Sequence, residues 1–212
     1  AASARGEAGH DEDGDHDAPA AASAPAPPAA QATAATPAPA APAAAPAGPS
    51  RWSVGKGSSI GFATTWGGQA IEGRFPKWTS EIVFAPDALD RSHVRVVIAL
   101  DAVSSGDAQR DQSLASADWF DTAQHPTAEF VASRFERTAD DRFTAHGKLT
   151  LRGVSRPVDL PFRLKIDGDK ATVSGVTTLD RTAFGVGQGE WQATDQIPAK
   201  VQVSLRLNAT RK

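Results

Sequence analysis

Apolar and polar residues alternate along most of the chain after residue 50. In the last such segment Val201, Val203, Leu205 and Leu207 alternate with polar residues, which gives the segment one apolar and one polar face. The same period of two predicts further strands over residues 59–66, 71–75, 81–85, 93–100, 127–135, 143–151, 158–166 and 171–179. Short turns separate these segments and no helix follows them at regular intervals. The pattern therefore excludes a doubly wound sheet and predicts an all-β antiparallel barrel or sandwich.

Two places depart from the alternation. Residues 104–120 lose the period of two and place Leu114, Ala117 and Trp119 on one helical face, which predicts one or two short helical turns between strands. Pro161 stands at an outward position of its strand and has no N–H to give to a ladder, so we expect an edge or a bulge there. A barrel of about eight strands either fills its interior with side chains or holds one small ligand. A helical insert over one end suits the second design, and the alternation is compatible with both.

Residues 1–50 contain no Val, Ile, Leu, Phe or Trp and consist largely of Ala and Pro. Without large apolar side chains to bury, nothing offsets the cost of ordering the backbone. We therefore expect a disordered tail or linker over 1–50 and one folded domain over 51–212. Residues 10–17 (His-Asp-Glu-Asp-Gly-Asp-His-Asp) are interpreted as a solubilising acidic patch, with weak metal collection as the less favoured alternative, and residues 18–49 as a spacer.

Charge and composition narrow the range of partners. The tail carries a net charge of −5 and the whole chain −3, so the folded part is close to neutral at +2. A nearly neutral domain lacks the basic footprint of nucleic-acid binding, and no apolar stretch reaches the roughly 20 residues of a membrane-spanning helix. The absence of Cys is compatible with an oxidising compartment. Because the chain opens on Ala-Ala-Ser-Ala, we expect a processed export product whose signal, and any membrane attachment, lie upstream of Ala1.

Candidate catalytic groups are few. Residues 57–61 (Gly-Ser-Ser-Ile-Gly) match the nucleophile elbow of hydrolases around Ser59, but a strand pattern continues where the elbow needs a helix. Asp118 and Asp121 are candidates for a glycosidase pair, yet local capping explains them more simply. The three histidines of the folded part have no zinc-site spacing. We expect no enzyme, no metal and no cofactor, with an esterase using Ser59 as a disfavoured alternative.

Six short motifs follow one another through residues 51–207. They are Trp-Ser-Val (52–54) leading to Ser-Ile-Gly-Phe (59–62), Glu-Gly-Arg-Phe (72–75), Val-Ser-Ser-Gly (103–106) running into Arg-Asp-Gln-Ser-Leu (110–114), Ala-Asp-Trp-Phe-Asp (117–121) with His-Pro-Thr-Ala-Glu-Phe (125–130), Gly-Lys-Leu-Thr-Leu-Arg-Gly-Val (147–154) and Asp-Arg-Thr-Ala-Phe-Gly (180–185). In this order they resemble the YceI-like family of bacterial, mostly exported, polyisoprenoid-binding proteins. The resemblance implies an extended antiparallel eight-stranded, lipocalin-like barrel whose interior takes a long isoprenoid, such as a quinone tail or polyprenyl lipid. It also implies a periplasmic protein, commonly a homodimer, that sequesters, stores or transports this lipid.

The ligand is expected against the inward-facing apolar positions, where each buried CH₂-sized unit contributes about 0.8 kcal/mol. The candidate ligand-binding residues are Phe62, Ile82, Phe84, Val96, Ile98, Phe130, Leu149, Leu151, Leu160, Phe162, Val173 and Val203, with Trp119, Phe120 and Phe184 near the mouth. Arg110, Asp111 and Arg181 are the candidate head-group residues, with structural pairs Arg110–Asp111 and Asp180–Arg181 as the favoured alternative. Because a barrel needs apolar filling with or without a ligand, the competing hypothesis is a solid-core structural or regulatory barrel that binds a protein partner.

Overall fold

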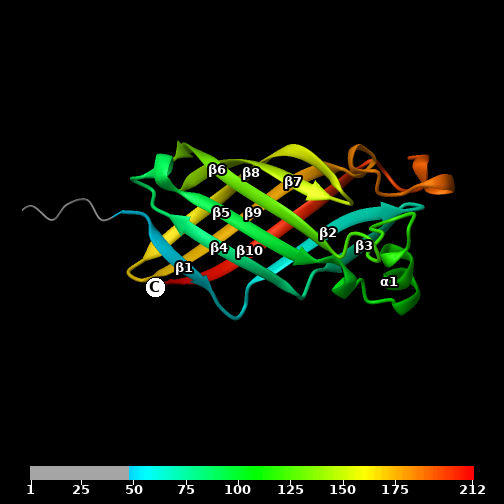
Figure 1. Ribbon diagram of the computed structural model, residues 1–212, viewed down its shortest axis with the longest axis horizontal. Coiled ribbons are helices and arrows are strands. Elements are labelled where there is room, and N and C mark those ends of the chain that lie inside the picture. The colour runs from blue at the N-terminus through cyan, green and yellow to red at the C-terminus, as the bar shows by residue number, and fades with distance from the viewer. Residues whose placement is uncertain (1–47) are drawn as a thin grey trace, which may run out of the picture. The chain divides into compact units, whose positions relative to one another are not determined.

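The computed structural model describes residues 48–212, which form one antiparallel sheet of ten strands that curls into a barrel (Figure 1). The strands are β1 (Ser50–Val54), β2 (Ser59–Trp66), β3 (Gln69–Arg74), β4 (Trp78–Phe84), β5 (His93–Ala99), β6 (Thr127–Ala139), β7 (Arg142–Leu151), β8 (Val154–Asp167), β9 (Lys170–Asp180) and β10 (Lys200–Arg211). The predicted segments agree with β2–β10 to within four residues at each end. The alternation gave no signal for the short strand β1. The tail predicted over 1–50 lies outside the described residues, apart from residues 48–50.

Strand β1 closes the barrel. It pairs on one side with β4, where Trp52 faces Ile82, and on the other with β10, where Trp52 faces Arg211. The closed ring therefore contains eight strands in the order β1, β4, β5, β6, β7, β8, β9 and β10. The hairpin β2–β3 joins β10 farther along, where Ile60 faces Leu205, and flanks the ring. This arrangement confirms the predicted all-β, antiparallel eight-stranded barrel.

The period of two in the sequence becomes an inner and an outer surface. In β10, for example, Leu207 and Ala209 are buried in the interior whereas the neighbouring Arg206 and Asn208 are exposed. A shift of one residue would turn every apolar side chain of a strand outward, so burial fixes the register of each ladder.

Pro161 lies where the ladder between β8 and β9 ends. The pairing of these strands begins at Phe162 and Gly175 and continues to the turn at residues 168–169, so the first half of β8 pairs only with β7. The missing N–H of Pro161 therefore costs no ladder hydrogen bond to β9, and the predicted strand edge is confirmed.

The helical elements other than the 3₁₀ turn η1 (Leu89–Arg91) gather at one end of the barrel (Figure 1). They are η2 (Leu100–Ala102), α1 (Ala108–Ala115), η3 (Arg181–Phe184) and η4 (Gly189–Gln192). The helix α1 lies within the predicted insert and begins after Asp107, whose side chain accepts a hydrogen bond of 2.8 Å from the Arg110 backbone N–H. The tip of the β2–β3 hairpin lies at the same end (Figure 1).

The opposite end of the interior is closed by aromatic side chains. Phe84 packs edge-on against Phe135, Phe143 and Phe162, with ring centroids 5.2 to 6.0 Å apart, and Phe143 stacks on Phe162 at 5.6 Å. This cluster is a packed core, and Phe143 is only 2% exposed. Aromatic side chains thus fill the barrel interior at this end.

Candidate functional site

Two apolar cavities occupy the barrel interior. The first, of about 210 Å³, lies toward α1, and the second, of about 160 Å³, lies toward the aromatic cluster. Both are lined by Ile60, Ile98, Leu149, Leu179 and Val203, so they adjoin each other along the same interior. The interior therefore offers an elongated apolar space rather than a single round hole.

The second cavity is almost free of polar groups. Thr177 is the one polar residue among those that line it, and its hydroxyl donates a hydrogen bond of 3.0 Å to the backbone carbonyl of Asp159. A wall of this kind stabilises hydrocarbon through burial and offers no partner to a polar ligand atom.

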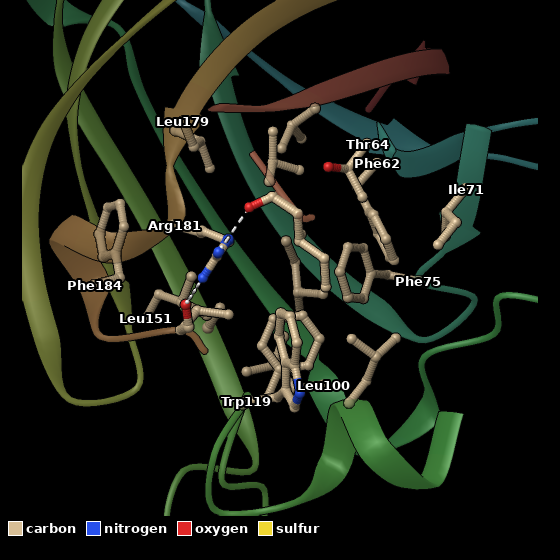
Figure 2. A pocket seen from close by; sticks show the side chains of 18 of the residues that line it. Phe62, Thr64, Ile71, Phe75, Leu100, Trp119, Leu151, Leu179, Arg181 and Phe184 are labelled. Atoms are coloured by element: carbon tan, nitrogen blue, oxygen red, sulfur yellow. Dashed lines mark hydrogen bonds between the residues drawn. The ribbon is translucent and has the colours of Figure 1, made fainter. Parts of the chain in front are cut away.

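The first cavity is covered by α1 and by the segment from η3 to residue 199 (Figures 1 and 2). Helix α1 contributes Arg110, Ser113 and Leu114, which are spaced three and four residues apart and so share one face. Strand β2 contributes Phe62, whose ring lies across Gly73 on β3, where any larger residue would clash with it. The residues that line this cavity thus come from the barrel wall and from both covering segments.

All fifteen predicted ligand-binding residues line these cavities. Phe62, Trp119, Phe120, Leu151 and Phe184 line the first, Ile82, Phe84, Val96, Phe130, Leu160, Phe162 and Val173 line the second, and Ile98, Leu149 and Val203 line both. Their contact with a ligand stays a prediction. Sequence reasoning missed further lining residues, namely Ile60, Thr64, Trp66, Ile71, Phe75, Leu179, Trp191 and Ile197. Ile60 and Thr64 lie at the same inward phase of β2 as Phe62, which was an available signal, whereas no periodicity marks Trp191 or Ile197.

Arg181 borders the first cavity but holds the covering segment in place. Its side chain is buried, and its guanidinium donates hydrogen bonds of 2.8 to 3.1 Å to the carbonyls of Pro198, Val186, Ala193 and Ile197. The guanidinium carbon lies 5.6 Å from the ring centroid of Trp119 (Figure 2 shows both side chains). Burial lowers the pKa of Arg181 by desolvating its charge. With four carbonyls bound, Arg181 is occupied as a structural residue.

The two charge pairs that the sequence suggested do not form direct ion pairs. Asp111 instead accepts hydrogen bonds of 2.8 and 2.6 Å from the backbone N–H and hydroxyl of Ser105, and it does not line either cavity. Asp180 caps η3 through Thr182, whose side-chain hydrogen bond holds the pKa of the Asp180 carboxyl below its usual value. Its nearest cation is Lys200, at 3.7 Å. Both carboxylates therefore organise the local backbone.

Two polar groups on the wall of the first cavity have no protein partner. The Thr64 hydroxyl oxygen and the Arg110 Nε atom are buried, and neither has a hydrogen-bond partner among the described residues. A buried polar group without a partner typically costs about 1–3 kcal/mol. Each is therefore a position at which a bound molecule could supply a missing contact.

Three tryptophan side chains contact one another in a row between the surface and the first cavity. Trp66, at the tip of the β2–β3 hairpin, is 42% exposed; its ring contacts Trp191 edge-on at 5.8 Å, and Trp191 lies 5.8 Å from the buried Trp119. Gln196 holds the hairpin tip, because its carbonyl accepts from Gly67 N–H at 2.9 Å and its side chain from Trp66 Nε1 at 3.4 Å. These contacts of Trp66 and Gly67 with Trp191 and Gln196 form the seam between the covering segment and the barrel wall.

The remaining candidates from the sequence were Ser59 and the pair Asp118 and Asp121. Ser59 lies in β2 opposite Arg206, and no helix follows it, so the nucleophile elbow does not form. The Asp118 carbonyl accepts from the backbone N–H groups of Gly187 and Gln188, and the Asp121 carbonyl from those of Gln124 and His125. Within residues 48–212 no three His, Asp or Glu side chains are placed to hold a metal ion, and no helix is long and apolar enough to cross a membrane.

Fold and cavities together define the class of protein first. An eight-stranded antiparallel barrel with an apolar interior is the architecture in which lipocalin-like proteins hold one small apolar molecule. The chain belongs to the family of YceI-like domains, whose family model matches residues 52–209 and so spans the barrel from β1 to β10.

Relatives and solved structures agree with this family. The chain is 29% identical over 139 residues to a UPF0312 protein of Azotobacter vinelandii, covering 63% of this chain and 72% of that protein, and 27% identical over 122 residues to one of Pseudomonas savastanoi, covering 55% and 64%. It is similar to the crystal structure of Burkholderia cenocepacia BcnA, with a TM-score of 0.72, 29% identity, and coverage of 74% of this chain and all of BcnA. A polyisoprenoid binding domain from Saccharophagus degradans, implicated in plant cell wall breakdown, shares the fold at 13% identity and a TM-score of 0.59, over 78% of this chain and all of that domain.

Proposed function

We propose that this protein binds a long-chain polyisoprenoid lipid, of the quinone or polyprenyl type, inside the barrel. The observation that carries the proposal is the pair of adjoining apolar cavities, with five shared wall residues and one polar residue in the second cavity. A polyisoprenoid consists almost entirely of hydrocarbon, and burial of about 0.8 kcal/mol per CH₂-sized unit favours it in such a space without reactive groups. The family of the chain, and the polyisoprenoid-binding neighbour with the same fold, support the same ligand class.

The proposal extends to where and how the lipid is used. We infer that the protein acts in the periplasm, or is otherwise exported, and that it sequesters, stores or transports the lipid there. The absence of Cys is compatible with an oxidising compartment. Fractionation of the native host with immunodetection tests the location, and light scattering of the purified chain tests the expected homodimer. Recovery of the protein only from the cytosol would contradict the location.

The central experiment is the identification of bound lipid. The full chain is purified from a bacterial host, extracted with organic solvent and analysed by mass spectrometry, before and after loading with an isoprenoid quinone. We expect an isoprenoid in the extract of the wild-type protein. If no lipid co-purifies and none can be loaded, the solid-core hypothesis replaces this proposal.

A pair of variants on β10 controls the experiment. Val203 lines both cavities, whereas its neighbour Gln202 is exposed on the outer surface. Val203→Trp places a large side chain in the shared interior, so we expect at least a tenfold loss of bound lipid, while Gln202→Trp keeps the wild-type amount. Circular dichroism verifies that both variants are folded. Equal lipid content in a folded Val203→Trp protein contradicts binding in the interior.

A further inference from the structure

The inner face of β2 carries one polar side chain in an otherwise apolar row. Ile60, Phe62, Thr64 and Trp66 occupy its inward positions, and all four line the first cavity. Thr64 lies beside Phe62 with its hydroxyl oxygen toward the lining side chains (Figure 2), and that oxygen is buried without a partner. Valine has nearly the same shape and would fill the position with no unsatisfied hydroxyl. Packing alone therefore does not explain a threonine there.

The face of α1 that covers the same cavity carries the second such group. Arg110 Nη1 donates to the carbonyl of Ser105 at 3.2 Å, while its buried Nε has no partner. Its nearest acids along the helix are used elsewhere: Asp107 accepts from the Arg110 backbone N–H, and Asp111 accepts from Ser105. Within residues 48–212, the guanidinium of Arg110 thus forms no salt bridge.

Two other polar side chains of this wall, those of Arg181 and Ser113, are already occupied. Arg181 is bound to four carbonyls, and the Ser113 hydroxyl donates to the carbonyl of Gln109 at 3.0 Å. The fully buried side-chain atoms of this wall that lack a partner are thus a hydroxyl and a guanidinium N–H, both of which donate hydrogen bonds. They match a ligand atom that accepts hydrogen bonds.

We propose that Thr64 and Arg110 bind the polar end of the isoprenoid, and that this end carries oxygen acceptors. The inference rests on the proposed function. It sets the direction of the ligand: the oxygen-bearing end lies in the first cavity under α1, and the hydrocarbon chain runs into the second cavity toward the aromatic cluster. A quinone carbonyl and a prenyl phosphate share this acceptor chemistry, whereas a pure hydrocarbon lacks it.

The test compares ligands with and without oxygen. The full chain is loaded from an equimolar mixture of an isoprenoid quinone and squalene, a hydrocarbon, and the bound ratio is measured by mass spectrometry. Thr64→Val is expected to lower the quinone-to-squalene ratio about fivefold to tenfold, the effect of one hydrogen bond to a buried group. The matched control is Thr65→Val, since Thr65 is the next residue of β2 and faces the other side of the strand.

Arg110 separates the two possible sources of the acceptor. In a parallel experiment the protein is loaded from a mixture of a prenyl phosphate and squalene. If the site is built for a phosphate, Arg110→Met is expected to reduce the bound phosphate-to-squalene ratio more than tenfold. If the site is built for a quinone, Arg110→Met should lower the quinone-to-squalene ratio only about as much as Thr64→Val does, because a carbonyl carries no net charge. Gln109→Met, at an exposed position of the same helix, is the control.

Each outcome of the ratio measurement is decisive. If the bound ratio is unchanged in both Thr64→Val and Arg110→Met, the inference is wrong although isoprenoid binding stands. If a variant loses quinone and squalene equally, the substitution has caused a packing defect and the inference is also wrong. Failure of the wild-type protein to take up any of the three probes, squalene included, contradicts the proposed function itself. The midpoint temperature of thermal unfolding of Thr64→Val should equal or exceed that of the wild type. This measurement separates a loss of selectivity from a loss of folding.

Discussion

Arg181 is buried with its charge because four backbone carbonyls surround its guanidinium. The planar guanidinium group of arginine carries several N–H donors and so reaches four carbonyls between Val186 and Pro198 at once. The single ammonium group of lysine does not have the geometry to do this. Gly187 allows this close approach, since a Cβ there would collide with Arg181 Nη1. At the scale of single residues, one cation thus fixes the backbone that covers the first cavity.

Replacement of Arg181 by lysine should therefore destabilise the protein without removing its charge. We expect a loss of about 3 kcal/mol in the free energy of unfolding, because several charge-assisted hydrogen bonds to buried carbonyls are lost. Urea unfolding measures this change in the free energy of unfolding. Arg163→Lys is the matched control: Arg163 is exposed and has a single ion pair with Asp141 at 3.1 Å, so its replacement should cost less than about 1 kcal/mol. Equal losses in the two variants would contradict this role of Arg181.

The β2–β3 hairpin behaves as a separate wall element. It is bound to the ring along one edge, through β10, and its tip is held by Gln196 and by the edge contact of Trp66 with Trp191. The tip contacts are few and partly exposed, whereas the β9–β10 ladder spans eleven residue pairs. Opening of the seam at Trp66 therefore disturbs less structure than separation of the ring strands, and the seam is the expected route into the first cavity.

Trp66→Ala should speed ligand release with little loss of stability. An aromatic pair contributes about 0.5–1.5 kcal/mol, so removal of the contact with Trp191 should raise the release rate by up to about tenfold. The rate of transfer of a loaded quinone from the protein to acceptor vesicles measures this effect. Val176→Ala, which changes an exposed apolar residue that lines neither cavity, is the control. An unchanged release rate would place the route elsewhere.

The whole barrel depends on the short strand β1 for closure. Trp52 is buried, its Nε1 donates to the carbonyl of Phe84 at 3.0 Å, and Arg211 lies over its ring at 5.1 Å. One side chain thereby joins β1, β4 and β10, the three strands at which the ring meets. Without this contact the edge of β4 and the end of β10 at residues 209–211 would be exposed, because β1 alone connects β4 with β10.

Trp52→Ala should consequently destabilise the entire barrel. We expect a loss of about 3–5 kcal/mol in the free energy of unfolding, as for other buried aromatic residues replaced by alanine. Faster amide exchange should extend through β1 and β4, and hydrogen exchange with urea unfolding measures both effects. Trp66→Ala is the matched substitution at an exposed tryptophan and should cost much less. Comparable losses for both tryptophans would mean that β1 is dispensable for closure.

The sequence by itself determined the all-β architecture and the inward-facing residues. Side chains of a strand alternate between two faces, so Phe62, Phe130 and Val203 could be assigned to the interior without knowledge of which strands are neighbours. The assignment was incomplete where the period was weak: β1 has five residues, and Trp191 lies in a segment without regular alternation.

Only the tertiary structure decided how polar groups are used and where space remains. Arg110 and Arg181 were equivalent as head-group candidates, yet Arg181 binds four carbonyls from residues 5 to 17 positions away, whereas Arg110 keeps a buried N–H without a partner. Hydrogen bonds and cavities depend on which distant segments meet, and the period of a strand carries no information about that. Local alternation therefore determined the all-β antiparallel architecture, while long-range packing closed it into a barrel, filled one end with aromatic side chains and left the rest of the interior as an apolar space.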